Sequence, residues 1–200
     1  MNDGGEAGSG IDAVDLLRAR EYDLLAALLG QTPTRGLLDQ IALLEGGASP
    51  LGHAHNSLAR AAAQADADTL SREFFDLFIG VGRGEFLPYA SYYLTGFLQE
   101  RPLARVREDL ATLGIERGEH LSEPEDHIAI LCEVMAGLAS RRFDAELATE
   151  RHFFEQHLKP WTARFFADLE TATSSRFYNA VGAVGRLFME IEAEAFAMTA

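Results

Sequence analysis

The chain has 200 residues, with 17 Lys and Arg against 31 Asp and Glu, so its formal net charge is −14. This length suits one domain with a real core, and a hydrophobic content of 48% excludes intrinsic disorder. The acidic balance argues against nucleic acid and anionic membrane surfaces as partners, because both are themselves negative. A basic partner is the electrostatic complement.

The N-terminal residues predict a disordered tail over residues 1–11. They are rich in Gly and contain no Lys or Arg, so they do not match a secretory signal. No apolar run approaches the roughly 20 residues that cross a bilayer. The single cysteine, Cys132, excludes an internal disulfide framework and lies in an apolar helical pattern as a small core residue. We therefore expect a soluble, cytoplasmic protein.

Apolar residues recur at spacings of three and four along most of the chain, which predicts helices. In chain order, the expected helices cover about 12–29, 37–44, 51–65, 68–79, 89–99, 103–113, 122–138, 144–157, 161–172 and 175–197. No segment alternates with a period of two, so no strand is expected. The prediction is an all-α fold, a single globular domain of about eight to ten helices.

One polar loop interrupts the helical pattern near the middle of the chain. Gly114 and Gly118 bracket it, and it predicts a hinge at 114–123. The hinge would join a larger N-terminal part, 12–113, to the C-terminal helices of 124–200. After it, the run Ser122-Glu-Pro-Glu125 has the pattern of a capping box and predicts a helix start at Ser122.

The glycines of Gly80-Val-Gly-Arg-Gly84 interrupt the helical pattern a second time. A dinucleotide fingerprint needs a preceding strand and the spacing G-x-G-x-x-G, and a Walker loop needs Gly-Lys-Ser/Thr. This loop has neither, so a turn that lets two helices approach is the favoured interpretation. A nucleotide-binding or nucleotide-hydrolysing loop is kept as an alternative.

Catalytic and metal-binding patterns are missing from the sequence. None of the six histidines has an acid three residues before it, as helical di-iron sites require, and there is no H-E-x-x-H motif. No serine stands in a G-x-S-x-G elbow. We therefore expect no metal, no cofactor and no catalytic activity.

Two clusters have the chemistry of a peptide site. Residues 74–93 concentrate large aromatic and apolar side chains around the glycine loop, where Phe78, Leu87 and Tyr89 can line a groove for an apolar peptide. The run Glu123-Pro-Glu-Asp-His127 supplies carboxylates that can pair with a guanidinium. Taken alone, this second cluster is better explained as the start of a helix.

Three ordered blocks resemble the TorD/DmsD family of molybdoenzyme maturation chaperones. They are Glu73-Phe-Phe-Asp-Leu-Phe-Ile-Gly80 with Gly82-Arg-Gly-Glu-Phe-Leu-Pro-Tyr-Ala-Ser-Tyr-Tyr-Leu94, then Glu123-Pro-Glu-Asp-His-Ile128, then Phe153-Phe-x-x-His-Leu-x-Pro-Trp161 with Phe165-Phe166. The resemblance implies an all-helical chaperone of the cytoplasm that is not an enzyme. Such a chaperone binds the twin-arginine signal peptide, the apo form of a molybdopterin oxidoreductase, or both. It holds its client for cofactor insertion before export.

The resemblance also implies the residues that bind the peptide. In the first block these are Leu77, Phe78, Pro88, Tyr89 and Ser91, and in the hinge motif Pro124, Asp126 and His127. Glu123 and Glu125 join them as carboxylates able to meet an arginine. Since some members exchange domains, the chain is expected to be a monomer or a domain-swapped dimer. An acidic adaptor that recognises folded partners is the remaining alternative.

Overall fold

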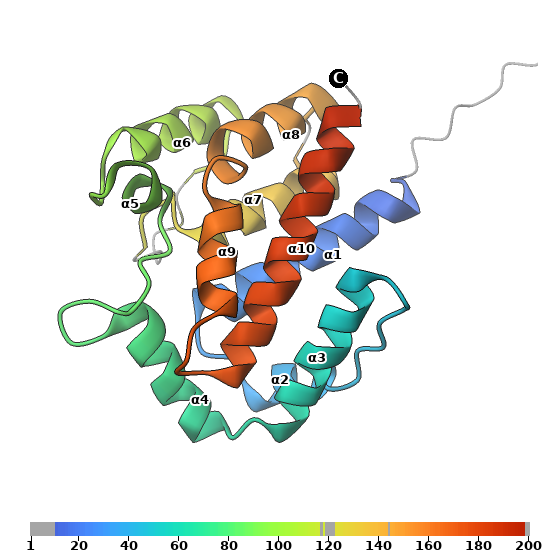
Figure 1. Ribbon diagram of the computed structural model, residues 1–200. Helices are drawn as coiled ribbons and strands as arrows, with labels where there is room; N and C mark the ends of the chain where they lie inside the picture. Colours follow the sequence, from blue (N-terminus) through green and yellow to red (C-terminus); the bar gives the residue numbers. More distant parts are fainter. Residues whose placement is uncertain (1–10, 117, 119–122, 144, 199–200) are drawn as a thin grey trace, which may run out of the picture.

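Figure 1 shows the computed structural model, which describes residues 11–116, 118, 123–143 and 145–198. These residues form ten α-helices and two π-helical segments and no strand, which confirms the all-α prediction. The elements are α1 Ala13–Gly30, α2 Arg35–Ile41, α3 Pro50–Gln64, α4 Ala67–Phe74, η1 Phe75–Ile79, α5 Ala90–Thr95, α6 Arg101–Thr112, α7 Ile128–Ala139, α8 Leu147–Phe153, η2 Phe154–Leu158, α9 Thr162–Glu170 and α10 Arg176–Met198.

Helix α7 lies at the centre of the fold. All its residues except Glu133 are buried, as expected for a helix that is apolar on every side. It packs along α1, while α10 packs against α9 and α3, so the core forms between these helices (Figure 1). Cys132 is a free, fully buried thiol within this core, as the sequence predicted.

Two helices expected from the apolar period end in π-helical turns. The pattern over 68–79 is resolved into α4 and η1, and the pattern over 144–157 into α8 and η2. The amide of Gly80 donates to the carbonyl of Phe75 at 2.7 Å, and the amide of Lys159 donates to the carbonyl of Phe154 at 2.9 Å, closing the two turns. Such turns often lie at functional sites, and both fall within the family blocks.

The predicted helix start at Ser122 is wrong. Helix α7 begins at Ile128, with His127 as the residue that caps it. Before it, the amide of His127 donates to the carbonyl of Pro124 at 3.0 Å, so Pro124 lies in a turn and not in a helix. Ser122, half of the predicted hinge and residues 1–10 of the predicted tail lie outside the described residues. The hinge and the division at 114–123 therefore stay predictions.

The packing of α9 on α10 depends on a glycine. A Cβ atom on Gly182 would lie 2.4 Å from the backbone nitrogen of Glu170, which no side chain tolerates. Beside it, the side-chain amide of Asn179 donates to the carbonyls of Leu169, Glu170 and Ala172 and so satisfies the end of α9. The two helices thus meet at backbone distance.

We expect Gly182→Ala to lower the free energy of unfolding by about 1–3 kcal/mol, because α9 must move away from α10. Urea unfolding followed by circular dichroism measures the loss. Gly36→Ala is the matched control, since a Cβ at Gly36 meets nothing within 4 Å. The control is expected to lose nothing. Equal stability of Gly182→Ala and the wild type would contradict the close approach.

Candidate functional site

The first two family blocks meet at one junction in the structure. An isolated antiparallel bridge joins Tyr89 to His127. The amide of Ala90 donates to the carbonyl of Asp126 at 3.0 Å, and the amide of Ile128 donates to the carbonyl of Pro88 at 2.9 Å. The start of α5 is thereby tied to the start of α7, so residues from both blocks can form one site.

Asp126 lies fully buried beneath this junction. Its Oδ2 atom accepts a hydrogen bond from the amide of Ser91 at 2.8 Å, in the first turn of α5. Among the described residues, Asp126 Oδ1 and Ser91 Oγ, both buried, have no hydrogen-bond partner. Buried polar atoms usually have a partner. These two atoms therefore mark the polar centre of the junction.

His127 combines a structural role with an uncharged ring. Its Nδ1 accepts a hydrogen bond from the amide of Ala129 at 3.2 Å, which places the ring proton on Nε2. The ring packs edge-on against Tyr89, with 5.0 Å between centroids. Burial lowers the pKa of His127 from 6.5 to about 4, against the opposing charges of Glu123 and Asp126. His127 is therefore neutral at physiological pH.

The three carboxylates of the run Glu123-Pro-Glu-Asp-His127 differ in their exposure to solvent. Asp126 is fully buried, and Glu125 is buried with its Oε2 accepting from Arg107 Nε at 2.9 Å. Glu123 is half-buried, and its Oε2 accepts a hydrogen bond from the hydroxyl of Tyr89. Burial and the carboxylate of Glu123 raise the pKa of Tyr89, so the phenol keeps its proton. Glu123 is the carboxylate that a ligand in solvent reaches first.

The apolar part of the first block is turned mostly inward. Leu77 is fully buried, and the ring of Phe78 packs on Phe74 and Tyr178, with centroids 5.1 and 5.2 Å away. The carbonyl of Leu77 accepts from the amide of Phe86 at 2.8 Å, which fixes η1 to the segment leading to α5. Pro88 and Ser91 are buried, whereas Tyr89 and Pro124 are half-buried. Most of the residues predicted in this block are therefore buried and not exposed to a ligand in solvent.

The glycine loop between η1 and α5 forms a turn. Gly80 and Gly82 have φ angles of 62° and 92°, a region that favours glycine. A Cβ on Gly80 would lie 2.1 Å from the carbonyl oxygen of Arg83. Val81 projects into solvent with 98% of its surface exposed. This geometry agrees with the interpretation as a turn.

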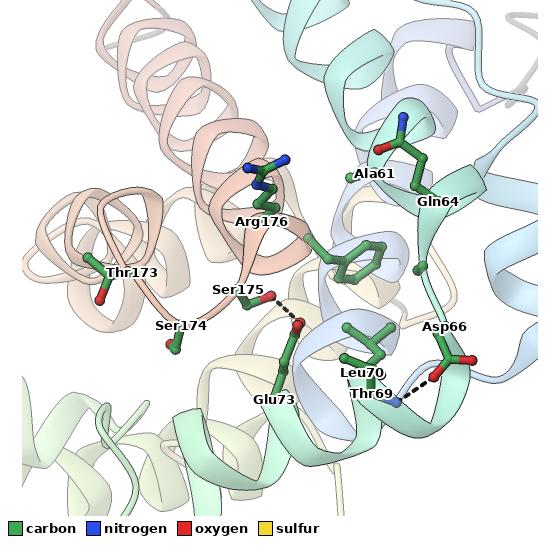
Figure 2. Close-up of a pocket in the computed structure, with 12 residues that line it drawn as sticks. Ala61, Gln64, Asp66, Thr69, Leu70, Glu73, Thr173, Ser174, Ser175 and Arg176 are labelled. Atoms are coloured by element: carbon green, nitrogen blue, oxygen red, sulfur yellow. Dashed lines mark hydrogen bonds between the residues drawn. The ribbon is translucent and has the colours of Figure 1, made fainter.

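A cavity of about 440 Å³ lies away from this junction, between the α3–α4 turn and the start of α10 (Figure 2). Ser175 Oγ donates to Glu73 Oε2 at 2.6 Å across it, and Asp66 caps α4 at its edge. None of the predicted site residues lines it. Over the described part of the chain, no three His, Cys, Asp or Glu side chains are grouped to hold a metal ion.

Known relatives identify the class of protein to which the chain belongs. The family model of the nitrate reductase delta subunit matches residues 45–167. A chaperone protein TorD of Vibrio atlanticus is 27% identical over 200 residues, covering 88% of this chain and 93% of the relative. One of Vibrio vulnificus is 30% identical over 192 residues, covering 84% and 89%. The class is therefore that of chaperones, not of enzymes.

A solved structure shares the fold. A candidate redox enzyme maturation protein from Archaeoglobus fulgidus superposes with a TM-score of 0.57 at 24% identity, covering 87% of this chain and 93% of that one. With the matches above, the chain belongs to the TorD family of molybdoenzyme maturation chaperones, as its three blocks indicated. Within the described residues, no helix is long and apolar enough to span a membrane.

Proposed function

We propose that this chaperone binds the twin-arginine signal peptide of a molybdopterin oxidoreductase in the cytoplasm. It holds the apo-enzyme there until the cofactor has been inserted and export begins. The observation that carries the proposal is the junction of Tyr89, Glu123 and Asp126, which combines the half-buried carboxylate of Glu123, bonded to Tyr89, with the fully buried carboxylate of Asp126, bonded to the Ser91 amide. We also propose that the chaperone is a monomer or a domain-swapped dimer.

The chemistry of the junction suits two adjacent guanidinium groups. A guanidinium pairs with a carboxylate through two parallel hydrogen bonds, and the half-buried Glu123 offers such a carboxylate. In this proposal the second guanidinium opens the Tyr89–Glu123 contact and bonds to Asp126 Oδ1, a buried acceptor without a partner among the described residues. Pro88 and Ser91 are bonded to the junction through their backbone, Leu77 and Phe78 are buried in the core behind the first block, and the net charge of −14 steers a basic peptide toward the site.

We expect Glu123→Gln to weaken binding of a twin-arginine signal peptide about 10- to 100-fold, because a charge-assisted pair is lost while the side chain keeps its shape. Isothermal titration measures the affinity. Asp39→Asn is the matched control, since Asp39 lies exposed on α2 and its loss changes the net charge equally. Equal weakening by both substitutions would show that only overall charge matters and would remove Glu123 from the site.

A further inference from the structure

The corner between α5 and α6 exposes apolar side chains. Residues 94–99, Leu-Thr-Gly-Phe-Leu-Gln, contain no charge in a chain whose net charge is −14. Leu94, Phe97 and Leu98 are 43%, 70% and 46% exposed. Single exposed apolar residues are ordinary, but three within five positions are concentrated at one corner, and exposed apolar patches mark interaction surfaces. We call Leu94, Phe97 and Leu98 the corner patch.

Hydrogen bonds hold the corner patch in place. Thr95 Oγ1 donates to the carbonyl of Ser91 at 2.8 Å and accepts from the amide of Phe97 at 3.2 Å. Gly96 and Gln99 take φ angles of 83° and 59°, so the chain turns sharply on both sides of Phe97. A non-glycine residue at positive φ costs free energy and persists only where its surroundings impose it. The exposure of the patch is thus built into the turn.

The corner patch is connected directly to the proposed arginine site. The amide of Ser91 donates to Asp126 Oδ2 and its carbonyl accepts from the hydroxyl of Thr95, so a line of hydrogen bonds runs from the junction to the corner. Helix α5 has six residues and is therefore about 9 Å long. A peptide whose arginines lie at Glu123 reaches the corner patch within about six residues if helical, or three if extended.

We propose that the corner patch binds the apolar stretch that follows the two arginines of the signal peptide. This inference rests on the proposed function and adds the surface that the peptide's apolar part covers. The charge pattern fixes the orientation, since the acidic junction lies at one end of α5 and the uncharged corner at the other. Burial of Phe97 and Leu98 by the peptide then increases the affinity, and Glu123 makes the binding specific for arginine.

Other exposed apolar groups fit this occupant less well. Phe75, Ile79 and Val81 belong to η1 and the glycine loop, and this loop carries Arg83, whose positive charge opposes a basic peptide. Val14 and Leu17 lie at the start of α1, at the opposite end of the molecule from α5 (Figure 1). Among the described residues, the corner patch is linked to the junction through α5, and its segment, residues 94–99, contains no charged side chain.

The test is a titration of two peptides against variants of the full chain. One peptide is a twin-arginine signal of a molybdopterin oxidoreductase, and the other keeps both arginines but has its apolar stretch replaced by serines. We expect the pair Phe97→Ser with Leu98→Ser to weaken the first peptide at least tenfold. The second peptide is expected to bind the variant and the wild type equally. It has no apolar stretch to contact residues 97 and 98, so their loss cannot weaken its binding.

Two single variants serve as matched controls. Leu43→Ser removes an exposed leucine after α2, and Val81→Ser removes the exposed side chain of the glycine loop; neither is expected to change affinity. Thermal unfolding confirms that all variants are folded.

The possible outcomes separate the two proposals. A corner variant that binds the first peptide as the wild type does would overturn the inference and leave the proposed function intact, as would a loss confined to Val81→Ser. A wild type that binds neither peptide would overturn both. Self-association that disappears in the corner variant, seen by sedimentation while peptide affinity is unchanged, would assign the patch to a second copy of the chain.

Discussion

Replacing Arg18 by Met is expected to lower the free energy of unfolding by about 3–5 kcal/mol, the cost of leaving buried charges without their partner. Arg18 Nε and Nη2 donate to the two oxygens of Glu192 at 2.7 and 2.6 Å, and Nη2 also meets Glu150 Oε1 at 2.6 Å. The Tyr22 hydroxyl donates to Glu192 at 2.9 Å. Glu192 is 1% exposed.

The substitution removes the cation from between these two carboxylates, which tie α8 and α10 to α1. Burial already raises the pKa of Glu150, although Arg18 opposes this rise. Chemical unfolding measures the loss in Arg18→Met. Adding Glu150→Gln and Glu192→Gln is expected to recover a large part of it, because no buried charge then remains unpaired.

A surface ion pair supplies the control for this prediction. Arg35 and Asp39 pair at 2.8 Å with side chains 60% and 59% exposed, so Arg35→Met is expected to cost less than about 1 kcal/mol. A loss of that small size in Arg18→Met would show that the buried network does not hold these helices together.

The second large effect is a loss of stability in acid that comes from His127. Its pKa is about 4 in the folded chain against 6.5 unfolded. Above pH 6.5 both states are neutral and stability does not depend on this group. Between pH 6.5 and 4 only the unfolded state takes up the proton, so stability falls by about 1.4 kcal/mol per pH unit, roughly 3 kcal/mol in all.

His127→Asn isolates this contribution, because Asn can cap α7 but does not titrate. Urea unfolding of both proteins from pH 7.5 to 4 gives the difference in slope. The wild type is expected to lose stability more steeply than His127→Asn below pH 6.5. Parallel curves would mean that the pKa of His127 is the same in the folded and the unfolded chain. They would contradict the lowering of this pKa by burial.

The sequence predicted the helices because their burial follows a period that residue identity reveals. The sequence prediction fails where the backbone departs from that period, as in η1 and η2, because a π-helical turn does not change the apolar pattern enough to be recognised. The start of α7 was placed too early because Ser122 to Glu125 fit a capping pattern, whereas pairing with Tyr89 moves the helix start to Ile128.

The chemistry of the residues suggested both clusters of the candidate site and the family resemblance named further residues, but neither predicts that the two clusters meet. Residues 89 and 127 are distant in the chain, and their contact depends on how α5 and α7 pack. Periodicity also does not reveal that Leu77 points inward while Phe75 and Ile79 remain exposed. The network of Arg18 with Glu150 and Glu192 was missed altogether, because its members lie 132 and 174 residues apart.

The most direct test of the chaperone account is isothermal titration of the wild-type protein with twin-arginine signal peptides, each beside a control with two lysines. Lysine keeps the charge but cannot form the two parallel hydrogen bonds of a guanidinium. The account predicts micromolar binding of at least one peptide and at least tenfold weaker binding of its lysine control. Equal affinities for the two, or no binding of any signal peptide, would contradict it.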